Sequence, residues 1–258
     1  MWLSVARIVE RPDYQGRGSH APIAAIKDIA RNKYSRILIT VFFLENVSLS
    51  FIATLFPFVT QYILPNETRA SGGFLTFAMV VTLISFPMWF PLSRRFGKRN
   101  TWIAANVLKV IAFSSLYFTT PQTLWLGYFA LICIGMSLSA HVILAPSVKA
   151  DVVDYDELET GERKEGAYFA AWNLVQKLAG ALAVVFSGYL LQFSGYEANI
   201  EQSEAALTLM RTLFAGLPFA LHIIVIVLLL RFSLNEVEHS KIRRAIDARN
   251  ALASQKNQ

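Results

Sequence analysis

Three ionisable side chains lie inside long apolar stretches of the 258-residue sequence: Glu45, Lys109 and Lys177. A charge at the centre of a bilayer costs at least ~2.5–3.5 kcal/mol, so each group needs a wet cavity or an opposite charge. Glu45 is the only acid inside such a stretch, and it can pair with Lys177 or line a cavity. Lys109 can bind a ligand, pair with an acid or line the same cavity.

Lys177 lies near the middle of its apolar stretch, too deep for its ammonium group to reach either surface easily. Asn173 is its i,i+4 neighbour on one helix face, and Trp172 and Gln176 fall within the same turn. An aromatic ring, two amides and a cation suit a polar ligand such as a sugar, whose hydroxyls the amides would bind. The alternative is a structural lysine that joins two helices through a carboxylate.

A second charged cluster follows the fourth apolar stretch. Asp151 and Asp154 are spaced i,i+3 and therefore share a helix face, and Arg163 and Lys164 follow across a short turn. Together with the basic residues at 94–99 they can form ion pairs that hold one side of the protein shut. The alternative is a solvated loop, in which each exposed pair contributes only ~0–1 kcal/mol. Because no histidine or third carboxylate stands at a suitable spacing, we expect no metal site and no cofactor.

The elements that carry these residues are predicted by hydropathy. The chain is 54% hydrophobic and only 16% charged, and long apolar stretches alternate with short charged ones. This pattern predicts an all-α membrane protein with six transmembrane helices. We expect a cytoplasmic segment at 1–35 with a short amphipathic helix near 22–34, a transmembrane domain at 36–232 and a basic cytoplasmic tail at 233–258. The expected spans are about 36–62, 70–92, 101–119, 123–147, 166–193 and 207–232.

The basic residues predict the orientation of these helices. Of the 24 lysines and arginines, all but Arg69, Arg211, Lys109 and Lys177 fall on one side of the predicted membrane. By the positive-inside rule both termini are therefore cytoplasmic. The net charge of +6 is thus a topology signal, and no nucleic-acid partner is expected.

An enzyme is a less favoured interpretation. An intramembrane protease needs a Ser–His pair or paired aspartates within the spans, whereas Asp151 and Asp154 fall at the membrane edge. His141 and His222 stand alone in the sequence, which favours packing or hydrogen bonding over a ligand role. The single cysteine, Cys133, excludes a disulfide framework and a cysteine-ligated metal site.

The segment ADVVDYDELETGERKEGAYFAAWNLVQKLAGALA, at residues 150–183, resembles a known family. The glycoside–pentoside–hexuronide:cation symporters, a branch of the major facilitator superfamily, share its A-D-x-x-D-Y and T-G-x-R-x-E-G motifs and its later mid-membrane lysine. Weaker similarity at RPDYQGRG and SGYEANIEQSEAALTLMRTLFAGLP extends it over nearly the whole chain. The matching residues are Asp151, Asp154, Tyr155, Thr160, Gly161, Arg163, Glu165, Gly166 and Lys177.

The resemblance implies roles for several residues. It places the chain as the C-terminal half of a twelve-span carrier, with the substrate held between two six-helix halves. Asp151, Asp154 and Arg163 would form a cytoplasmic gate, with Arg94 or Arg95 as partners. Lys177 would lie near the cation and sugar sites. The positions that would face the sugar are Trp172, Asn173 and Gln176.

The function implied is cation-coupled symport of sugars or glycosides across the bacterial inner membrane. The coupling ion would be Na⁺ or H⁺, bound mainly by an N-terminal half that this chain lacks, and that half would be a partner. Two alternatives stay open: a lipid or lysolipid transporter of the same superfamily, and a non-functional truncated fragment.

Overall fold

A computed structural model describes residues 22–64 and 71–256, and every regular element within these ranges is a helix. The first part of the predicted cytoplasmic segment, residues 1–21, and Arg69 lie outside the described residues. The elements are α2 (Pro22–Arg31), α3 (Lys33–Phe58), η2 (Val59–Ile63), α4 (Ser71–Phe96), α5 (Lys98–Tyr117), α6 (Leu124–Thr160), α7 (Glu165–Phe193), α8 (Glu204–Arg211), η4 (Thr212–Gly216), α9 (Leu217–Arg231) and α10 (Glu236–Lys256).

Five helical segments in the described part are long and apolar enough to cross a membrane. They comprise α3 with η2, α4, α6, α7, and α8 continued through η4 into α9. The helix α5 occupies the predicted third span, but its polar residues, Lys109 among them, keep it out of this group. The predicted all-α membrane fold is therefore confirmed.

Local sequence explains where several helices begin and end. The Asn32 side chain caps α3 by accepting hydrogen bonds from the backbone N–H groups of Tyr34 and Ser35. Gly97, with φ of 84°, separates α4 from α5, and Gly161, with φ of 80°, ends α6. Both have the left-handed backbone conformation that glycine adopts without a steric penalty.

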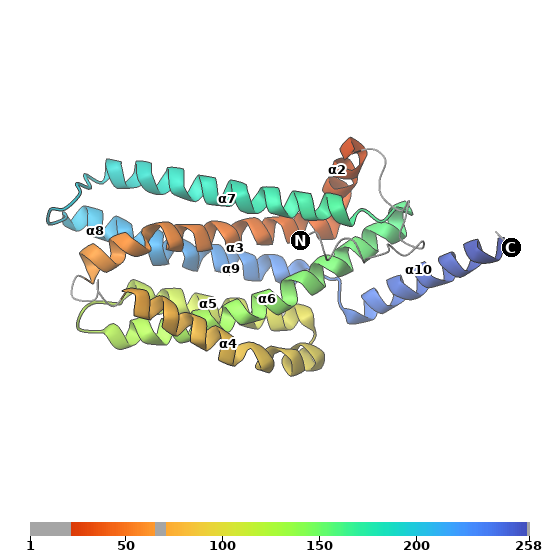
Figure 1. The fold of residues 1–258 in the computed structure, drawn as a ribbon, viewed down its shortest axis with the longest axis horizontal. Coiled ribbons are helices and arrows are strands. Elements are labelled where there is room, and N and C mark those ends of the chain that lie inside the picture. Colours follow the sequence, from red (N-terminus) through yellow and green to blue (C-terminus); the bar gives the residue numbers. More distant parts are fainter. Residues whose placement is uncertain (1–21, 65–70, 257–258) are drawn as a thin grey trace, which may run out of the picture.

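The helices form a bundle that is split on one face (Figure 1). On one side α3 packs against α7 and α9, and on the other α6 packs against α4 and α5. Contacts between α5 and α9 join the two sides. These two helices lie behind α6 and α3 in the view of Figure 1. Because α3 and α6 touch little, a groove runs between them, floored by α5 and α9.

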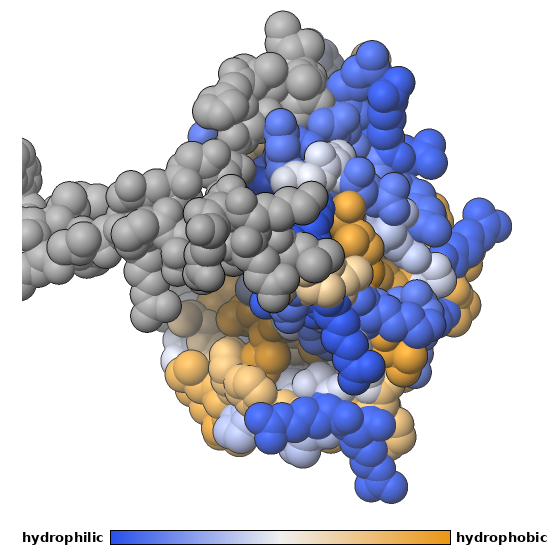
Figure 2. All heavy atoms as spheres, turned by 90° about the vertical axis from the view of Figure 1, so that its right-hand side faces the viewer, coloured by the Kyte–Doolittle hydropathy of each residue, from blue (hydrophilic) through white to orange (hydrophobic). Residues whose placement is uncertain are grey.

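Apolar and charged surfaces are segregated along the bundle. Large apolar side chains of α4 and α7 are exposed, for example Met79, Leu83, Ile84 and Phe186. Hydrophilic residues gather at the end that carries α10 and the α6–α7 loop, seen in Figure 2. We call this the basic end. An apolar belt beside a charged end is the surface that a bilayer-embedded protein presents.

The close approach of α4 and α6 gives a test of the packing. A Cβ atom at Gly135 would lie 2.8 Å from the carbonyl oxygen of Ala78 and 2.9 Å from Val81. Gly135→Ala should therefore destabilise the bundle by about 1–3 kcal/mol through overpacking. The matched control is Gly188→Ala, since no atom lies within 4 Å of its added Cβ. Thermal unfolding of both variants in detergent measures the difference, and equal midpoints would contradict the packing described.

Candidate functional site

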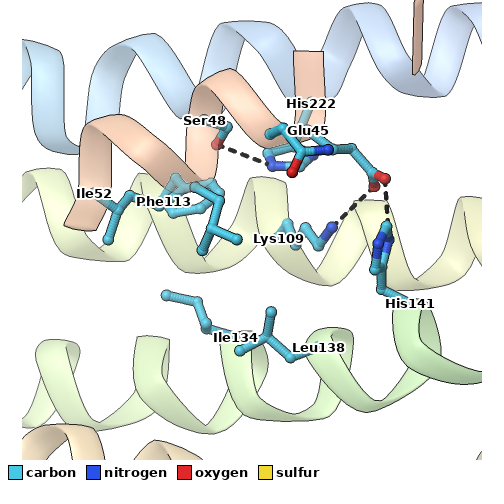
Figure 3. Close-up of a pocket in the computed structure, with 11 residues that line it drawn as sticks. Glu45, Ser48, Ile52, Lys109, Phe113, Ile134, Leu138, His141 and His222 are labelled. Atoms are coloured by element: carbon cyan, nitrogen blue, oxygen red, sulfur yellow. Dashed lines mark hydrogen bonds and ion pairs between the residues drawn. The ribbon is translucent and has the colours of Figure 1, made fainter. Parts of the chain in front are cut away.

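The groove between α3 and α6 contains an open cavity of about 60 Å³ that is lined from four helices (Figure 3). The charged and polar groups of its wall come from α3, α5, α6 and α9. Apolar residues line the remainder. The lining residues are Glu45, Asn46, Ser48, Leu49, Ile52, Lys109, Phe113, Ile134, Leu138, His141 and His222.

Glu45 is the centre of the polar wall. It lies on the same face of α3 as the buried Leu38, Phe42 and Ser48, so the helix turns its carboxylate inward. Lys109 of α5 donates to Glu45 Oε1 at 2.9 Å, and the indole N–H of Trp102 approaches the same oxygen at 3.3 Å.

A third helix reaches the same carboxylate. His141 of α6 places Nδ1 3.1 Å from Glu45 Oε2. The Glu45 side chain is only 4% exposed, whereas the His141 side chain is 29% exposed. Within the cluster, therefore, Glu45 is shielded from solvent, whereas His141 is partly accessible to it.

Burial makes the charges of this cluster costly unless they are paired. Removing a charge from water costs several kcal/mol, and an ion pair offsets that cost only when both partners are present and hydrogen bonded. Glu45 and Lys109 meet this condition, since each is at least 90% buried by side-chain area. The structure therefore gives Glu45 a partner on α5 and places it in the cavity wall. From the sequence, Glu45 was expected either to pair with Lys177 of α7 or to line a cavity.

His222 of α9 extends the polar wall. Its Nδ1 lies 2.8 Å from the Asn106 side-chain oxygen, and its Nε2 lies 3.2 Å from Ser48 Oγ. A neutral imidazole that donates from Nδ1 and accepts at Nε2 satisfies both contacts. The ring stacks on Phe113, with centroids 5.4 Å apart. His222 is thus both packed and hydrogen bonded.

An apolar cavity of about 190 Å³ lies next to this polar cavity, away from the basic end. The two cavities share Leu49, Ile52, Ile134 and Leu138 in their linings, so they adjoin each other. Beyond these residues almost all the lining is apolar, and Arg211 lies at its border. The groove can therefore hold a charged or polar group at one end and an apolar group at the other.

The α7 residues predicted to bind a ligand divide between two environments. Asn173, Gln176 and Lys177 are exposed, whereas Trp172 is buried and lies 6.5 Å, centroid to centroid, from Phe42. Trp172 therefore does not share the exposed face of the other three. Its ring is held in the core of the bundle instead.

The depth of Lys177 follows from the packing of α7 on α3. The two helices run parallel, since Tyr168 meets Asn32 near both helix starts. Further along, Trp172 meets Phe42, and Gly180 approaches Ser50. Residue 177 thus lies at the level of α3 that includes Glu45.

Lys149 of α6 is a groove residue that sequence reasoning missed. Its ammonium nitrogen lies 3.9 Å from the ring centroid of Phe42 and 4.8 Å from that of Trp172. These cation–π contacts bridge α6 to α3 and α7 on the basic-end side of the cavity. The residue stands beside the predicted charged cluster, and only the tertiary arrangement shows that it points to aromatic rings.

The predicted gate residues meet at the basic end, with different partners. Asp151 pairs with Lys98 at 2.6 Å, and Asp154 pairs with Arg163 at 3.0 Å. Arg94 and Arg95 were the expected partners, but both are exposed, and no ion pair joins them to a described carboxylate. Their position at the end of α4 points them outward, whereas Lys98 begins α5 beside α6.

The tail also contributes to this cluster. It forms the helix α10, from which His239 approaches Asp154 at 3.0 Å and Arg243 approaches it at 3.5 Å. Two apolar residues of α10, Ile242 and Ile246, are buried in the core. The tail is therefore a helix docked on α6, which its basic composition did not reveal.

Lys164 ties the α6–α7 loop to the start of the described chain. Its ammonium group lies 2.9 Å from Asp28 and 3.5 Å from Asp156. Burial alone would lower the pKa of Lys164, but the hydrogen bond to Asp28 and the charge of Asp156 raise it above its ordinary value. The lysine thus stays charged and links α2, α6 and α7.

With the fold and groove described, comparison with known proteins shows the class. Residues 1–236 match the family described as MFS/sugar transport protein, and the chain belongs to that family. The family and the relatives below are transporters rather than enzymes. The all-α bundle fits one half of such a carrier.

Three relatives illustrate the range of the family. An uncharacterized symporter of Synechocystis sp. is 28% identical over 198 residues, 74% of this chain and 36% of the relative. An Escherichia coli protein provisionally described as a sulfoquinovose importer is 31% identical over 195 residues, 74% and 41% of the two chains. A sodium-dependent lysophosphatidylcholine symporter of Danio rerio is 26% identical over 161 residues, 61% and 30%. The chain spans less than half the length of each.

The buried ion pair predicts strong coupling between two substitutions. Glu45→Gln or Lys109→Met alone should cost about 3–5 kcal/mol, because each leaves an unpaired charge, whereas the double variant should cost less than either. The exposed pair of Lys241 and Glu238 is the control, and Lys241→Met should change stability by no more than ~1 kcal/mol. Detergent unfolding of the set measures the coupling, and additive costs would count against the pair.

The raised pKa of Lys164 predicts a pH-dependent contribution to stability. Because the pKa is higher in the folded than in the unfolded chain, the stabilisation is complete below the unfolded value of about 10.4 and is lost as pH rises through the folded value. Lys164→Met should therefore be most destabilising near neutral pH. Unfolding at neutral pH and above about pH 11 tests this, and a constant difference would contradict it.

Proposed function

We propose that this chain forms one wall of the substrate site of a secondary transporter that couples movement of a sugar or glycoside to a cation. A second six-helix half supplies the opposite wall. The observation that carries the proposal is the exposed polar face of α7, with Asn173, Gln176 and Lys177, on a helix that packs against the groove-lining α3.

The environment of Lys177 supports a binding role. It lies at the level of Glu45 in a segment apolar enough to span a membrane, and no ion pair joins it to a described residue. A lysine at that depth requires an anion or water nearby. The substrate or a carboxylate of the second half meets this need, and the neighbouring amides can bind hydroxyl groups.

The surroundings proposed for the protein follow from its charges. The basic end faces the cytoplasm of a bacterium, and the apolar belt lies in the inner membrane. The ion pairs of Asp151, Asp154 and Arg163 then lie on the cytoplasmic side, where they hold the wall closed. The coupling ion is Na⁺ or H⁺.

A second candidate, transport of a lysolipid, is favoured by one specific observation. The apolar cavity adjoins the charged one, which suits a molecule with a polar head and a hydrocarbon chain. One of the relatives, from Danio rerio, is named as a sodium-dependent lysophosphatidylcholine symporter, which supports this second candidate.

A chimera can test both candidates. This chain would replace the matching part of the Escherichia coli relative, and uptake of labelled sulfoquinovose and of labelled lysophosphatidylcholine would be measured in cells. We expect sugar uptake, with at least a tenfold loss on Lys177→Met at unchanged membrane abundance. The control is Lys241→Met, since Lys241 is exposed on α10. Full uptake by the Lys177 variant would overturn the role of the α7 face, and lipid uptake alone would select the second candidate.

A further inference from the structure

We propose that Lys149 and the indole N–H of Trp172 form a binding site for the anionic group of the substrate, which is then a hydroxylated organic anion, a carboxylate or a sulfonate. As a substrate subsite the inference rests on the proposed function, but as a site that binds an organic anion it stands alone. Lys149 follows His141 on α6 by about two helical turns, towards the basic end. The site is thus separate from the exposed polar face of α7.

The first argument is the ammonium group of Lys149, which has aromatic neighbours but no counter-charge. Its nitrogen lies 3.9 Å from the ring centroid of Phe42 and 4.8 Å from that of Trp172. No hydrogen bond or ion pair joins it to another residue in the described part of the chain. An ammonium group has three N–H donors, and two ring faces accept at most two of them. At least one donor is left for water or for an oxygen of a ligand.

The second argument is an unpartnered donor in the same place. Trp172 is 3% exposed, and its indole nitrogen has no hydrogen-bond partner among the described residues. A buried N–H without an acceptor is costly. Tyr168 and Phe169 pack against the ring and hold it in place. An anion bound at Lys149 comes to the ring that carries this N–H, so one of its oxygens can accept from the ammonium group and another from the indole.

The third argument is that the carboxylates of the neighbouring helices are engaged elsewhere. Glu45 of α3 accepts from Lys109 at 2.9 Å. Asp151 of α6 pairs with Lys98 at 2.6 Å and projects about 200° around the helix from Lys149. The charge of Lys149 is therefore unpaired within the described residues. Because aromatic rings flank it, an incoming anion is attracted more strongly than it would be in bulk water.

The fourth argument is access. Direct contacts between α3 and α6 are few, and the cation–π contacts of Lys149 bridge these helices. Lys149 is half-buried, so solvent reaches part of its side chain. The ring of Phe42 also lies 5.5 Å, centroid to centroid, from that of His141, which lines the polar cavity. An anionic group at Lys149 can therefore enter between α3 and α6, with the hydroxyl-bearing part of the molecule directed towards that cavity.

The experiment follows the indole N–H signal of Trp172 by nuclear magnetic resonance, in the intact chain labelled with ¹⁵N-tryptophan in detergent. Trp172→Phe, which keeps an aromatic ring, assigns the signal by its loss. The probes are galacturonate, 2-hydroxyethanesulfonate, the neutral sugar galactose and inorganic sulfate. We expect a saturable shift with at least one organic anion and none with galactose at equal concentration. An equal shift with galactose, or no saturable shift with either organic anion, would overturn the proposal.

Variants of the lysine test its role directly. Lys149→Met should raise the half-saturating concentration by about tenfold or more, because a charge-assisted hydrogen bond is lost. The matched control Lys241→Met should leave it unchanged, since Lys241 is exposed on α10. An unchanged value in Lys149→Met would remove the lysine from the site.

Two further comparisons keep the test decisive. The signals of the other tryptophans report whether a variant folds, and Lys149→Gln replaces Lys149→Met if the latter does not. Sulfate that binds as tightly as the organic anions would overturn the assignment to an organic substrate. Because no transport is measured, failure of the chimera would not affect this result, and failure here would leave uptake of a neutral sugar possible.

Discussion

A carboxylate inside an apolar bundle must find cations and donors among its neighbours, and that requirement governs how the helices of this chain meet. Glu45 brings α3 to Lys109 and Trp102 of α5 and to His141 of α6. The bonds of His222 add α9 to the same wall. Lys109 is one of the polar residues that make α5 less apolar than its neighbours, and its charge is paired with Glu45 inside the bundle.

The same arrangement leaves the groove asymmetric. Its polar cavity lies against charged groups, while the adjoining cavity is apolar. The exposed amides and lysine of α7 lie outside both linings, on a helix that packs against α3. Under the proposed function such a wall would receive a hydroxyl-rich ring or, for the second candidate, a hydrocarbon chain with a polar head. This fits a family whose members are named for substrates as different as a sulfonated sugar and a lysophospholipid.

The sequence predicted the spans, the charged cluster near 150–166 and the family, because hydropathy, charge and local motifs are properties of short segments. It could not assign Lys109 to Glu45, since 64 residues separate them and only the bundle brings them together. Trp172 is one residue from Asn173, yet a rotation of about 100° along the helix turns it into the core. The docking of α10 likewise depends on buried Ile242 and Ile246, which the charged composition of the tail obscures.

The length of α6 has a mechanical consequence. Its 37 residues carry His141 at the groove and Asp154 at the basic end, about 20 Å apart at the rise of an α-helix. Pro146 lies between them and has no N–H to donate to the preceding turn. The missing hydrogen bond makes Pro146 the place where this helix bends most easily, so a tilt of the segment before it would reach the aspartates only in part.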